Sequence, residues 1–522
     1  MRKGIVVFAL LLLAKGIGCN PAEPQEKGLA GTRPNIIIIL ADDLSYRDLS
    51  IWGQQKFTTP HLDELALQGL RFTQSYSGAP ECAPSRGTLM TGLHTGHGPI
   101  RQNSSTRGQD HLADEDITLA EVLKEAGYVT GFTGKWGIGL PGTPGTPDKQ
   151  GFDYSYGYYD QRRAHTYYPH FLYENGEKIQ LPGNYGFDLQ RLYRNNTLDP
   201  DPADINQYDE NGDLVPVGVT DPSKVEYSEA LIEEKALQFV KDNKDKPFFL
   251  YFATQLPHGP TIIDNLGDLK GRDDYPGTKH KEWAAMVKRL ETFTGELIAL
   301  LKQLGIYENS IFFFASDNGY SQCGYFGRGN AGTNWPDDPF LKNKGPFRGG
   351  KFSVLEGGIR VPFFVTWAGK IPAGVSHEPV WLLDIFPTAA KLAGASYEHE
   401  IDGLNLLPLL EGRLDAFEGH KALYWQKGNE QAVRMGPWKA FRSHPDEAVE
   451  LFLVEEDTYC ERNLAEFYPE VVGEAERLMR ESWTPHEWYH NPGETKEQSE
   501  AKTKRADELG QLQIALEGNS SK

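Results

Sequence analysis

The chain contains little cysteine, which limits the part that disulfide bonds can play in its fold. Only four of its 522 residues are cysteines, so it is not a small scaffold held together by dense disulfides. A bridge between Cys323 and Cys460 is one possibility in an oxidising compartment, and two separate apolar thiols are the other. Cys82 has no evident partner, so its role must be sought in its own surroundings.

Positive charge is also scarce. The chain has 53 Lys and Arg against 73 Asp and Glu, a formal net charge of −20. Bulk electrostatics therefore argue against nucleic acid or an anionic membrane as a partner. An acidic protein still binds an anion where cations gather locally, so any anionic substrate requires particular cationic side chains to be named.

Long apolar runs are missing except near the basic N-terminus. The apolar stretch at residues 5–14 is too short to span a membrane, which predicts a signal peptide at 1–18. Gly16–Cys19 resembles a bacterial lipoprotein cleavage site with Cys19 as the lipidated residue. Cleavage and secretion without a lipid is the alternative. With residues 19–32 as a polar tether, we expect an exported protein, periplasmic or anchored at the outer membrane of a Gram-negative bacterium.

Apolar strands alternate with helical segments through most of the chain. Runs rich in β-branched and aromatic residues predict strands at 33–40, 128–132, 247–253 and 310–316. Apolar residues recur at helical spacing at 60–70, 117–126, 225–243 and 283–304. This alternation predicts an α/β fold with α/β/α layers around a large, mainly parallel sheet.

The pattern changes near residue 412. Short strands with turns between them are expected at 422–425, 431–435, 438–442 and 450–453, and a helix follows near 469–483. We predict a main domain at 33–412, a C-terminal α+β subdomain with a small antiparallel sheet at 413–490, and a charged, frayed tail at 491–522.

A long polar insertion runs from residue 167 to 224, a length typical of functional loops. Within it, Asp209–Asp213 is interpreted as a hairpin turn. A calcium loop would need Gly and Glu where Leu214 and Thr220 stand.

One short segment carries the strongest functional signal. Glu81–Gly92 reads Cys-x-Pro-Ser-Arg and then an apolar run ending in Thr-Gly, and it resembles the signature of the type I, formylglycine-dependent sulfatases. The resemblance extends from about Pro34 to Arg413 and implies an alkaline-phosphatase-like fold. It also implies that a maturation enzyme, the formylglycine-generating enzyme, oxidises Cys82 to formylglycine (3-oxoalanine). The hydrate of that aldehyde would then be the nucleophile.

Oxygen ligands for a metal ion follow two of the predicted strands. Asp42 and Asp43 end the first, and Asp317 and Asn318 end another, at the sheet edge where α/β proteins bind ligands. Carboxylate and amide oxygens favour calcium over zinc. The resemblance implies one calcium ion held by these four residues together with the oxidised residue 82.

Four further side chains supply positive charge or a proton. The resemblance implies that Arg86 steadies the nucleophile, that Lys135 and Lys351 contact the sulfate, and that His258 binds sulfate or donates a proton. Glu356 and Arg360, in the same segment as Lys351, are expected to brace the loop.

One position departs from the family. Gly137 stands where the family usually has the histidine that deprotonates the nucleophile when sulfate is expelled. His165 is the replacement that we predict, and binding of sugar or packing among neighbouring tyrosines are its alternatives.

The expected substrate is a sulfated oligosaccharide or polysaccharide, in keeping with a bacterial carbohydrate sulfatase. His165, Arg162, Arg163 and Arg434 are the predicted substrate-binding residues, and sulfated galactose or N-acetylgalactosamine, with the sulfate at O4, is the predicted sugar. Two alternatives stay open at this point. One is a phosphatase or phosphodiesterase of the same superfamily, and the other is a non-catalytic carbohydrate-binding lipoprotein.

Overall fold

The computed structural model describes residues 28–185, 206–208, 214–216, 224–321 and 336–520. The predicted signal peptide, Cys19, Cys323 and the predicted turn at 209–213 lie outside these ranges. The segments flanking that turn, β8 (Asn206–Tyr208) and β9 (Leu214–Pro216), pair antiparallel, as a hairpin requires. Among the described helices, none is both long and apolar enough to cross a membrane.

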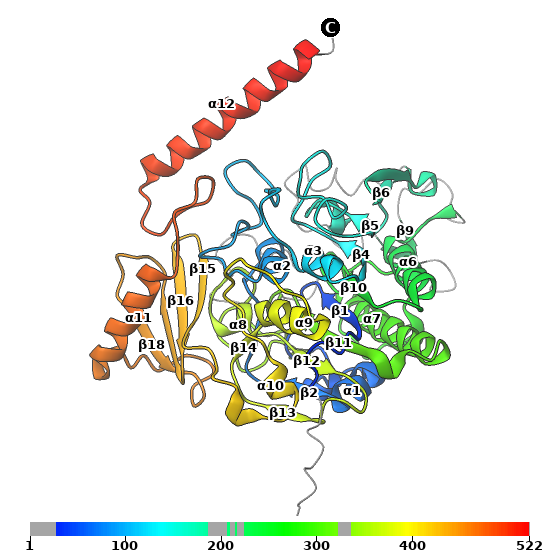
Figure 1. Ribbon diagram of the computed structural model, residues 1–522, viewed down its shortest axis with the longest axis horizontal. Helices are drawn as coiled ribbons and strands as arrows, with labels where there is room; N and C mark the ends of the chain where they lie inside the picture. The colour runs from blue at the N-terminus through cyan, green and yellow to red at the C-terminus, as the bar shows by residue number, and fades with distance from the viewer. Residues whose placement is uncertain (1–27, 186–205, 209–213, 217–223, 322–335, 521–522) are drawn as a thin grey trace, which may run out of the picture.

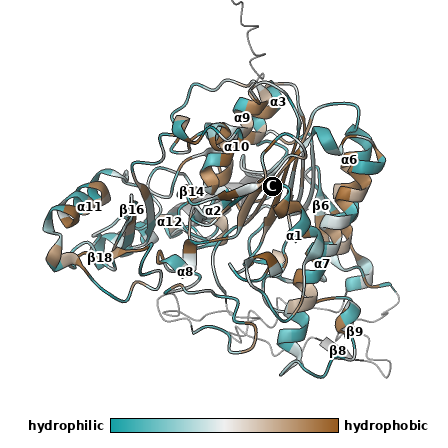
Figure 2. Cartoon of the chain, turned by 90° about the horizontal axis from the view of Figure 1, so that it is seen from below, coloured by the Kyte–Doolittle hydropathy of each residue, from teal (hydrophilic) through white to brown (hydrophobic). Residues whose placement is uncertain are grey.

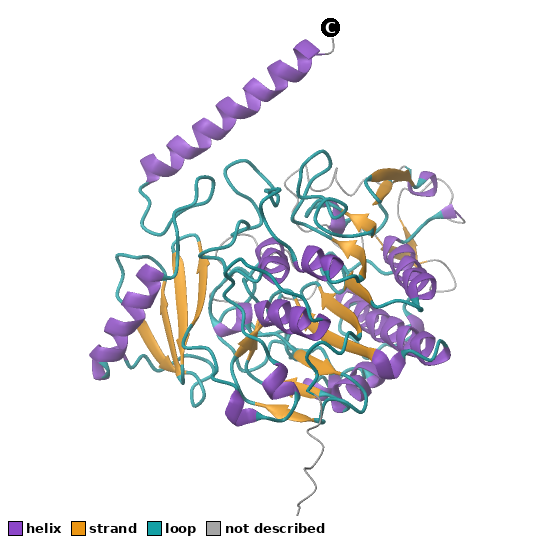
Figure 3. Ribbon diagram, viewed as in Figure 1, coloured by secondary structure: helices purple, strands orange, loops and turns teal. Residues whose placement is uncertain are grey.

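A ten-stranded mixed sheet forms the centre of the molecule (Figure 3). Its inner strands are parallel and match the predicted positions: β11 (Ser310–Ser316), β1 (Asn35–Ala41), β10 (Phe248–Ala253) and β4 (Val129–Lys135). The other strands lie outside these four, in the sheet order β13-β2-β12 on the β11 side and β5-β6-β7 on the β4 side. Their bounds are β13 (Gly374–Ser376), β2 (Leu70–Phe72), β12 (Phe363–Thr366), β5 (Tyr154–Tyr158), β6 (Phe171–Glu174) and β7 (Glu177–Gln180).

Helices cover both faces of this sheet (Figure 1). Alternate residues of β1 point to opposite sides, so Ile37 and Ile39 pack in one core and Ile36 and Ile38 in the other. The first core also contains residues of α1 (Pro60–Leu67), α6 (Ser228–Asn243) and α7 (Thr278–Gln303). The second contains residues of α2 (Cys82–Thr91), α3 (Leu119–Glu125), α9 (Ile385–Ala393) and α10 (Leu407–Leu410). The predicted three-layer α/β/α fold is therefore confirmed.

The C-terminal part forms the small antiparallel sheet that the sequence predicts. Its order is β15-β16-β17-β18, with bounds Leu423–Lys427, Glu430–Met435, Trp438–Arg442 and Glu450–Leu453. Helix α11 (Pro469–Glu481) packs Ala475 and Met479 against it. Figure 2 shows that α11 carries both hydrophilic and hydrophobic residues, as a helix covering one face of a sheet should. Short elements complete the fold: β3 (Ser75–Tyr76), β14 (Val380–Trp381) and α8 (Glu356–Ile359).

The tail differs from the prediction. Residues Lys496–Ser520 form α12, which extends away from the rest of the molecule in Figure 1, so the expectation of a frayed tail is wrong there. Ion pairs one turn apart, Lys496 with Glu500 at 3.5 Å and Lys504 with Glu508 at 3.9 Å, favour a helix in a charged sequence.

Candidate active site

The carboxyl ends of the four inner parallel strands bring the predicted residues together. Asp42 and Asp43 follow β1, Asp317 and Asn318 follow β11, and Lys135 is the last residue of β4. The loop after β10 contributes His258, and Lys351 comes from the segment before α8. All of these side chains are buried. A parallel sheet collects such residues because its strand ends point the same way.

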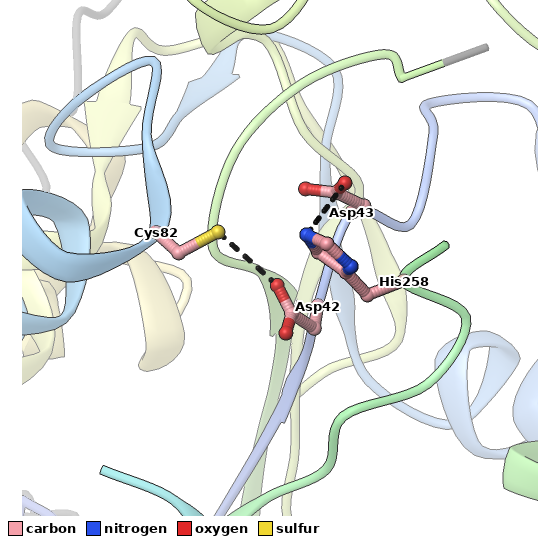
Figure 4. A group of neighbouring side chains, drawn as sticks. All are labelled: Asp42, Asp43, Cys82 and His258. Carbon is pink, nitrogen blue, oxygen red and sulfur yellow. Dashed lines mark hydrogen bonds and ion pairs between the residues drawn. The ribbon is translucent and has the colours of Figure 1, made fainter. Parts of the chain in front are cut away.

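Cys82 is the first residue of α2, where backbone N–H groups are not yet used within the helix. Its Sγ donates to Asp42 Oδ1 at 3.3 Å, and Lys351 Nζ lies 3.4 Å from the same sulfur (Figure 4 shows the Asp42 contact). Burial, Asp317 and Asp42 raise the pKa of the Cys82 thiol well above its ordinary value. The thiol as encoded is therefore a poor thiolate nucleophile.

Asp43 adopts the left-handed backbone conformation, with φ 64°, which Asp tolerates better than most residues. Its backbone N–H donates to Asp317 Oδ1 at 3.2 Å, and Asn318 Nδ2 donates to Asp43 Oδ1 at 2.7 Å. Lys351 Nζ reaches both Asp43 oxygens, at 2.7 and 2.8 Å. The residues after β1 and β11 thus hold each other in place across the strand ends.

Two more cations bind the remaining carboxylates. Arg86, one turn along α2 from Cys82, donates from Nε and Nη2 to Asp317 Oδ2 at 3.1 and 2.8 Å. Lys135 Nζ donates to Asp42 Oδ2 at 2.6 Å. Buried charges need such partners, because an unpaired one costs several kcal/mol of stability. The site thereby concentrates positive charge in an acidic protein.

Two histidines stack beside these lysines. The ring centroids of His165 and His258 lie 3.8 Å apart, and the angle between the two ring planes is 4°. Lys135 Nζ is 3.3 Å from His165 Nε2, and Lys351 Nζ is 3.0 Å from His258 Nε2. Since an ammonium only donates, both Nε2 atoms accept. Burial lowers the pKa of both imidazoles well below 6.5. At His165 the neighbouring His258 and then Lys135 lower the pKa further, and at His258 Lys351 and then Lys135 do so.

The residues fit a divalent cation. Ligand atoms of Asp42, Asp43, Cys82 and His258 all lie within 4.8 Å of one another. Asn318 Oδ1 is buried, and within the described residues it has no hydrogen-bond partner. A buried amide oxygen beside three carboxylates is a suitable ligand for a hard cation.

The three predicted substrate-binding arginines have different surroundings. Arg162 is exposed, while Arg163 pairs with Asp160 at 3.2 Å and lies over the Phe171 ring at 4.0 Å. Arg434 is buried in β16, where its Nη2 donates to Gln74 Oε1 at 2.6 Å. The structure therefore does not support a substrate contact for Arg434, because its guanidinium is enclosed between the subdomains.

Sequence reasoning missed Tyr167, although it lies two residues from His165. Its hydroxyl donates to the backbone oxygen of Gln255 at 3.0 Å and to that of His258, and so holds the loop after β10. Every residue has a backbone oxygen, so a contact made through one does not require a particular residue type that the sequence could reveal. Glu356 and Arg360 pair at 3.1 Å and brace their loop as predicted.

These features define a hydrolase with a buried nucleophile position, an oxygen-rich cation site and several cations for an anionic ester. The model of the sulfatase family matches residues 34–395. The chain is 32% identical over 448 residues to the N-acetylgalactosamine-6-sulfatase of Canis lupus familiaris, covering 83% of this chain and 74% of that protein. It is 29% identical to the N-acetylgalactosamine-6-O-sulfatase of Bacteroides thetaiotaomicron, covering 91% and 98%.

A solved structure agrees with these relatives. Ps i-CgsB in complex with k-i-k-neocarrahexaose superposes with a TM-score of 0.69 at 28% identity, covering 92% of this chain and 99% of that one. The chain belongs to the sulfatase family and is a sulfuric ester hydrolase with the alkaline-phosphatase-like fold.

Proposed function

We propose that the protein removes sulfate from a sulfated carbohydrate, using a formylglycine made from Cys82 and one calcium ion. The observation that carries this proposal is the position of Cys82, at the start of α2 and within 3.3 Å of Asp42 and 3.4 Å of Lys351. An oxygen nucleophile created there stands between a cation site and a lysine. Formylglycine-generating enzyme is the maturation partner that this chemistry requires.

The residues around position 82 divide the work. Once converted, residue 82 supplies as its hydrate the oxygen that takes the sulfuryl group from the ester. Lys135 and Lys351 bind the non-bridging sulfate oxygens, and Arg86 together with the N-terminus of α2 adds positive charge. Lys351 and His258 face each other at 3.0 Å, so this pair donates the proton to the leaving sugar oxygen.

The calcium ion would be held by Asp42, Asp43, Asp317, Asn318 and residue 82. It would polarise the sulfate group and favour the ionised form of a bound nucleophile. Within the described residues the buried Asn318 Oδ1 has no hydrogen-bond partner, which supports this ligand set.

His165 is the base that we propose for sulfate expulsion, because Gly137 has no side chain to serve. The lowered pKa keeps His165 neutral near pH 7, with Nε2 able to accept a proton. Replacing His165 by Ala should lower kcat on a synthetic sulfate ester about 100-fold. An unchanged kcat would remove His165 from the mechanism.

For the sugar, we propose galactose or N-acetylgalactosamine. Two relatives are by name N-acetylgalactosamine-6-sulfatases, whereas the sequence predicts O4, so the position is for experiment to decide. We assign recognition of neighbouring charge to Arg162 and Arg163, which precede His165 in the sequence and are exposed and half-buried. Export, with a lipid on Cys19 or without one, would place the enzyme among such polymers, at the outer membrane or in the periplasm of a Gram-negative bacterium.

The test is sulfate release by protein co-expressed with formylglycine-generating enzyme. The panel holds 4-O- and 6-O-sulfated galactose and N-acetylgalactosamine, 6-O-sulfated N-acetylglucosamine and an aryl sulfate. We expect activity on a galacto-configured sugar and none in Cys82→Ala. Activity on the glucosamine sulfate alone would refute the proposal of a galacto-configured sugar. A converted protein that is inactive on every ester would refute the proposed function.

A further inference from the structure

Gly137 and Gln161 occupy one space beside the reaction centre. A Cβ placed on Gly137 would lie 2.6 Å from Gln161 Oε1, too close for any real contact, and 3.7 Å from Arg86 Cδ. Gly137 also has φ 79°, a conformation that glycine adopts without strain. The amide of Gln161 therefore stands where a side chain at position 137 would begin.

Gln161 has an unused acceptor in this enclosed place. Its side chain is buried, with only 5% of the residue exposed, and in the described part of the chain Oε1 has no hydrogen-bond partner. A buried carbonyl oxygen without a donor is costly, so Oε1 is available to accept a hydrogen bond from a hydroxyl or N–H group that comes within reach.

A second glutamine fixes Gln161 in this position. Gln109 Oε1 accepts the backbone N–H of Gln161 at 2.6 Å, and Gln109 Nε2 donates to the backbone oxygens of Gly137 and Gly139 at 3.5 and 3.3 Å. Gln109 thereby ties the two segments together and holds the backbone of Gln161 beside that of Gly137.

Arg86 connects this place to the nucleophile. Its Cδ lies beside position 137, and its Nη2 is 3.7 Å from Asp42 Oδ1, the oxygen that Cys82 Sγ approaches at 3.3 Å. Arg86 therefore reaches from the space that Gln161 fills to the carboxylate beside residue 82.

We propose that Gln161 is a hydrogen-bond acceptor for a hydroxyl group at the reaction centre, the donor being a hydroxyl of the hydrated residue 82. This inference rests on the proposed function. Gln161 moves no proton, because an amide oxygen accepts a hydrogen bond without becoming a base. It orients the O–H group, and Gln109 is the positioning residue behind it.

Five variants test the role in converted protein. Gln161→Met keeps the size but not the acceptor, and Gln161→Glu keeps the acceptor. The others are Gln161→Ala, Gly137→Ala and the double variant that carries both changes to Ala. For each, kcat and KM are measured on an aryl sulfate and on the sulfated sugar. Gln150→Met is the matched control, because Gln150 is also buried and its Oε1 has no hydrogen-bond partner among the described residues, while its Nε2 donates to the backbone oxygens of Ala113 and Pro144.

We expect Gln161→Met to lower kcat about 10- to 100-fold on both substrates with KM within about threefold, and Gln161→Glu to restore kcat to within about fivefold. Gly137→Ala should lower kcat by displacing the amide, and much less so in the Gln161→Ala background. Gln150→Met should leave kcat unchanged. A purely structural role would lower the melting temperature without this rescue and this coupling.

Three results would overturn the inference: kcat of Gln161→Met within about twofold of wild type, additive effects of Gly137→Ala and Gln161→Ala, or a loss confined to the sugar. The last would make a sugar hydroxyl the donor. Intact mass verifies conversion of residue 82, with a loss of about 18 Da. Converted wild-type protein without activity on any ester would instead refute the proposed function.

Discussion

Two clusters of histidine and aspartate lie in the described part of the chain, and their chemistry differs. One is the strand-end group of Asp42, Asp43, Cys82 and His258. The other, which we call the loop cluster, consists of His94, His97 and Asp402. Each includes a stacked imidazole: His258 stacks on the neighbouring His165 with ring centroids 3.8 Å apart, and His94 stacks on His97 with ring centroids 4.2 Å apart. By composition alone, either could hold a metal ion.

The hydrogen bonds separate the two. Asp402 accepts the backbone N–H of His94 at 2.9 Å and approaches His97 Nδ1 at 3.0 Å, so its carboxylate fastens the chain after α2. His94 Nδ1 accepts from Gly96 N at 3.0 Å, which leaves a hydrogen on Nε2, the atom that faces Asp402. The lone pairs of the loop cluster thus accept hydrogen bonds from the backbone and side chains of the loop after α2. At the strand ends, the lysines come from distant segments, and Asn318 Oδ1 has no hydrogen-bond partner among the residues that the structure describes, so these groups are available to bind substrate and ion.

The largest contrast should appear when each cluster loses a carboxylate. Asp42→Asn removes the charge that faces Lys135 and Cys82, and we expect kcat/KM on an aryl sulfate to fall at least about 10³-fold with the fold retained. Asp402→Asn should keep kcat/KM within about threefold. Similar losses in both variants would show that the loop cluster takes part in catalysis.

The next effect is the pH dependence of stability. Burial lowers the pKa of His94 from 6.5 to about 4. Below pH 6.5 the unfolded chain binds a proton that the folded chain does not, so the free energy of unfolding falls as pH falls from 6.5 to 4, by about 1.4 kcal/mol per pH unit at most. In His94→Asn, whose Oδ1 can replace Nδ1 as acceptor for Gly96, urea unfolding should show a shallower decline. An equal decline would assign the effect to other groups.

Asp402→Asn should also lower stability. Its amide keeps one acceptor, while the backbone N–H of His94 and the His97 ring compete for it, so we expect a loss of about 1–3 kcal/mol in the free energy of unfolding at pH 7. Urea denaturation measures the loss. Unchanged stability would mean that the loop is held by its other contacts.

The smallest effect concerns the brace of the active-site loop. Tyr167→Phe removes the hydroxyl that donates to the backbone oxygens of Gln255 and His258, and it should cost about 1 kcal/mol of stability and no more than about tenfold in kcat. Kinetics and unfolding on the same sample compare the two. A larger loss in kcat would place Tyr167 in contact with the substrate.

The inner sheet could be predicted because its strands are continuous apolar runs bounded by polar residues. For β11 the predicted range, 310–316, is the observed one. The outer strands β5, β6 and β7, which follow β4 in the sheet order, escaped prediction because they mix tyrosine, glycine and charge, and their pairing depends on tertiary contacts. The tail helix α12 was missed because a charged composition was taken as disorder.

The site shows the same division. Asp42, Asp43, Asp317, Asn318, Lys135, His258 and Lys351 carry their own chemistry and stand in short motifs, so sequence could select them. The stacking of His165 on His258, the burial of Arg434 and the exclusion between Gly137 and Gln161 are relations between distant segments. Only packing in three dimensions decides them.

The most direct measurement is the mass of the peptide that contains residue 82, taken beside the activity of the same sample. Protein co-expressed with formylglycine-generating enzyme is separated with a hydrazide resin into aldehyde-bearing and thiol-bearing fractions. The account predicts that the fraction lighter by about 18 Da carries all the sulfatase activity. Full activity in the fraction with an unmodified Cys82 thiol would contradict it.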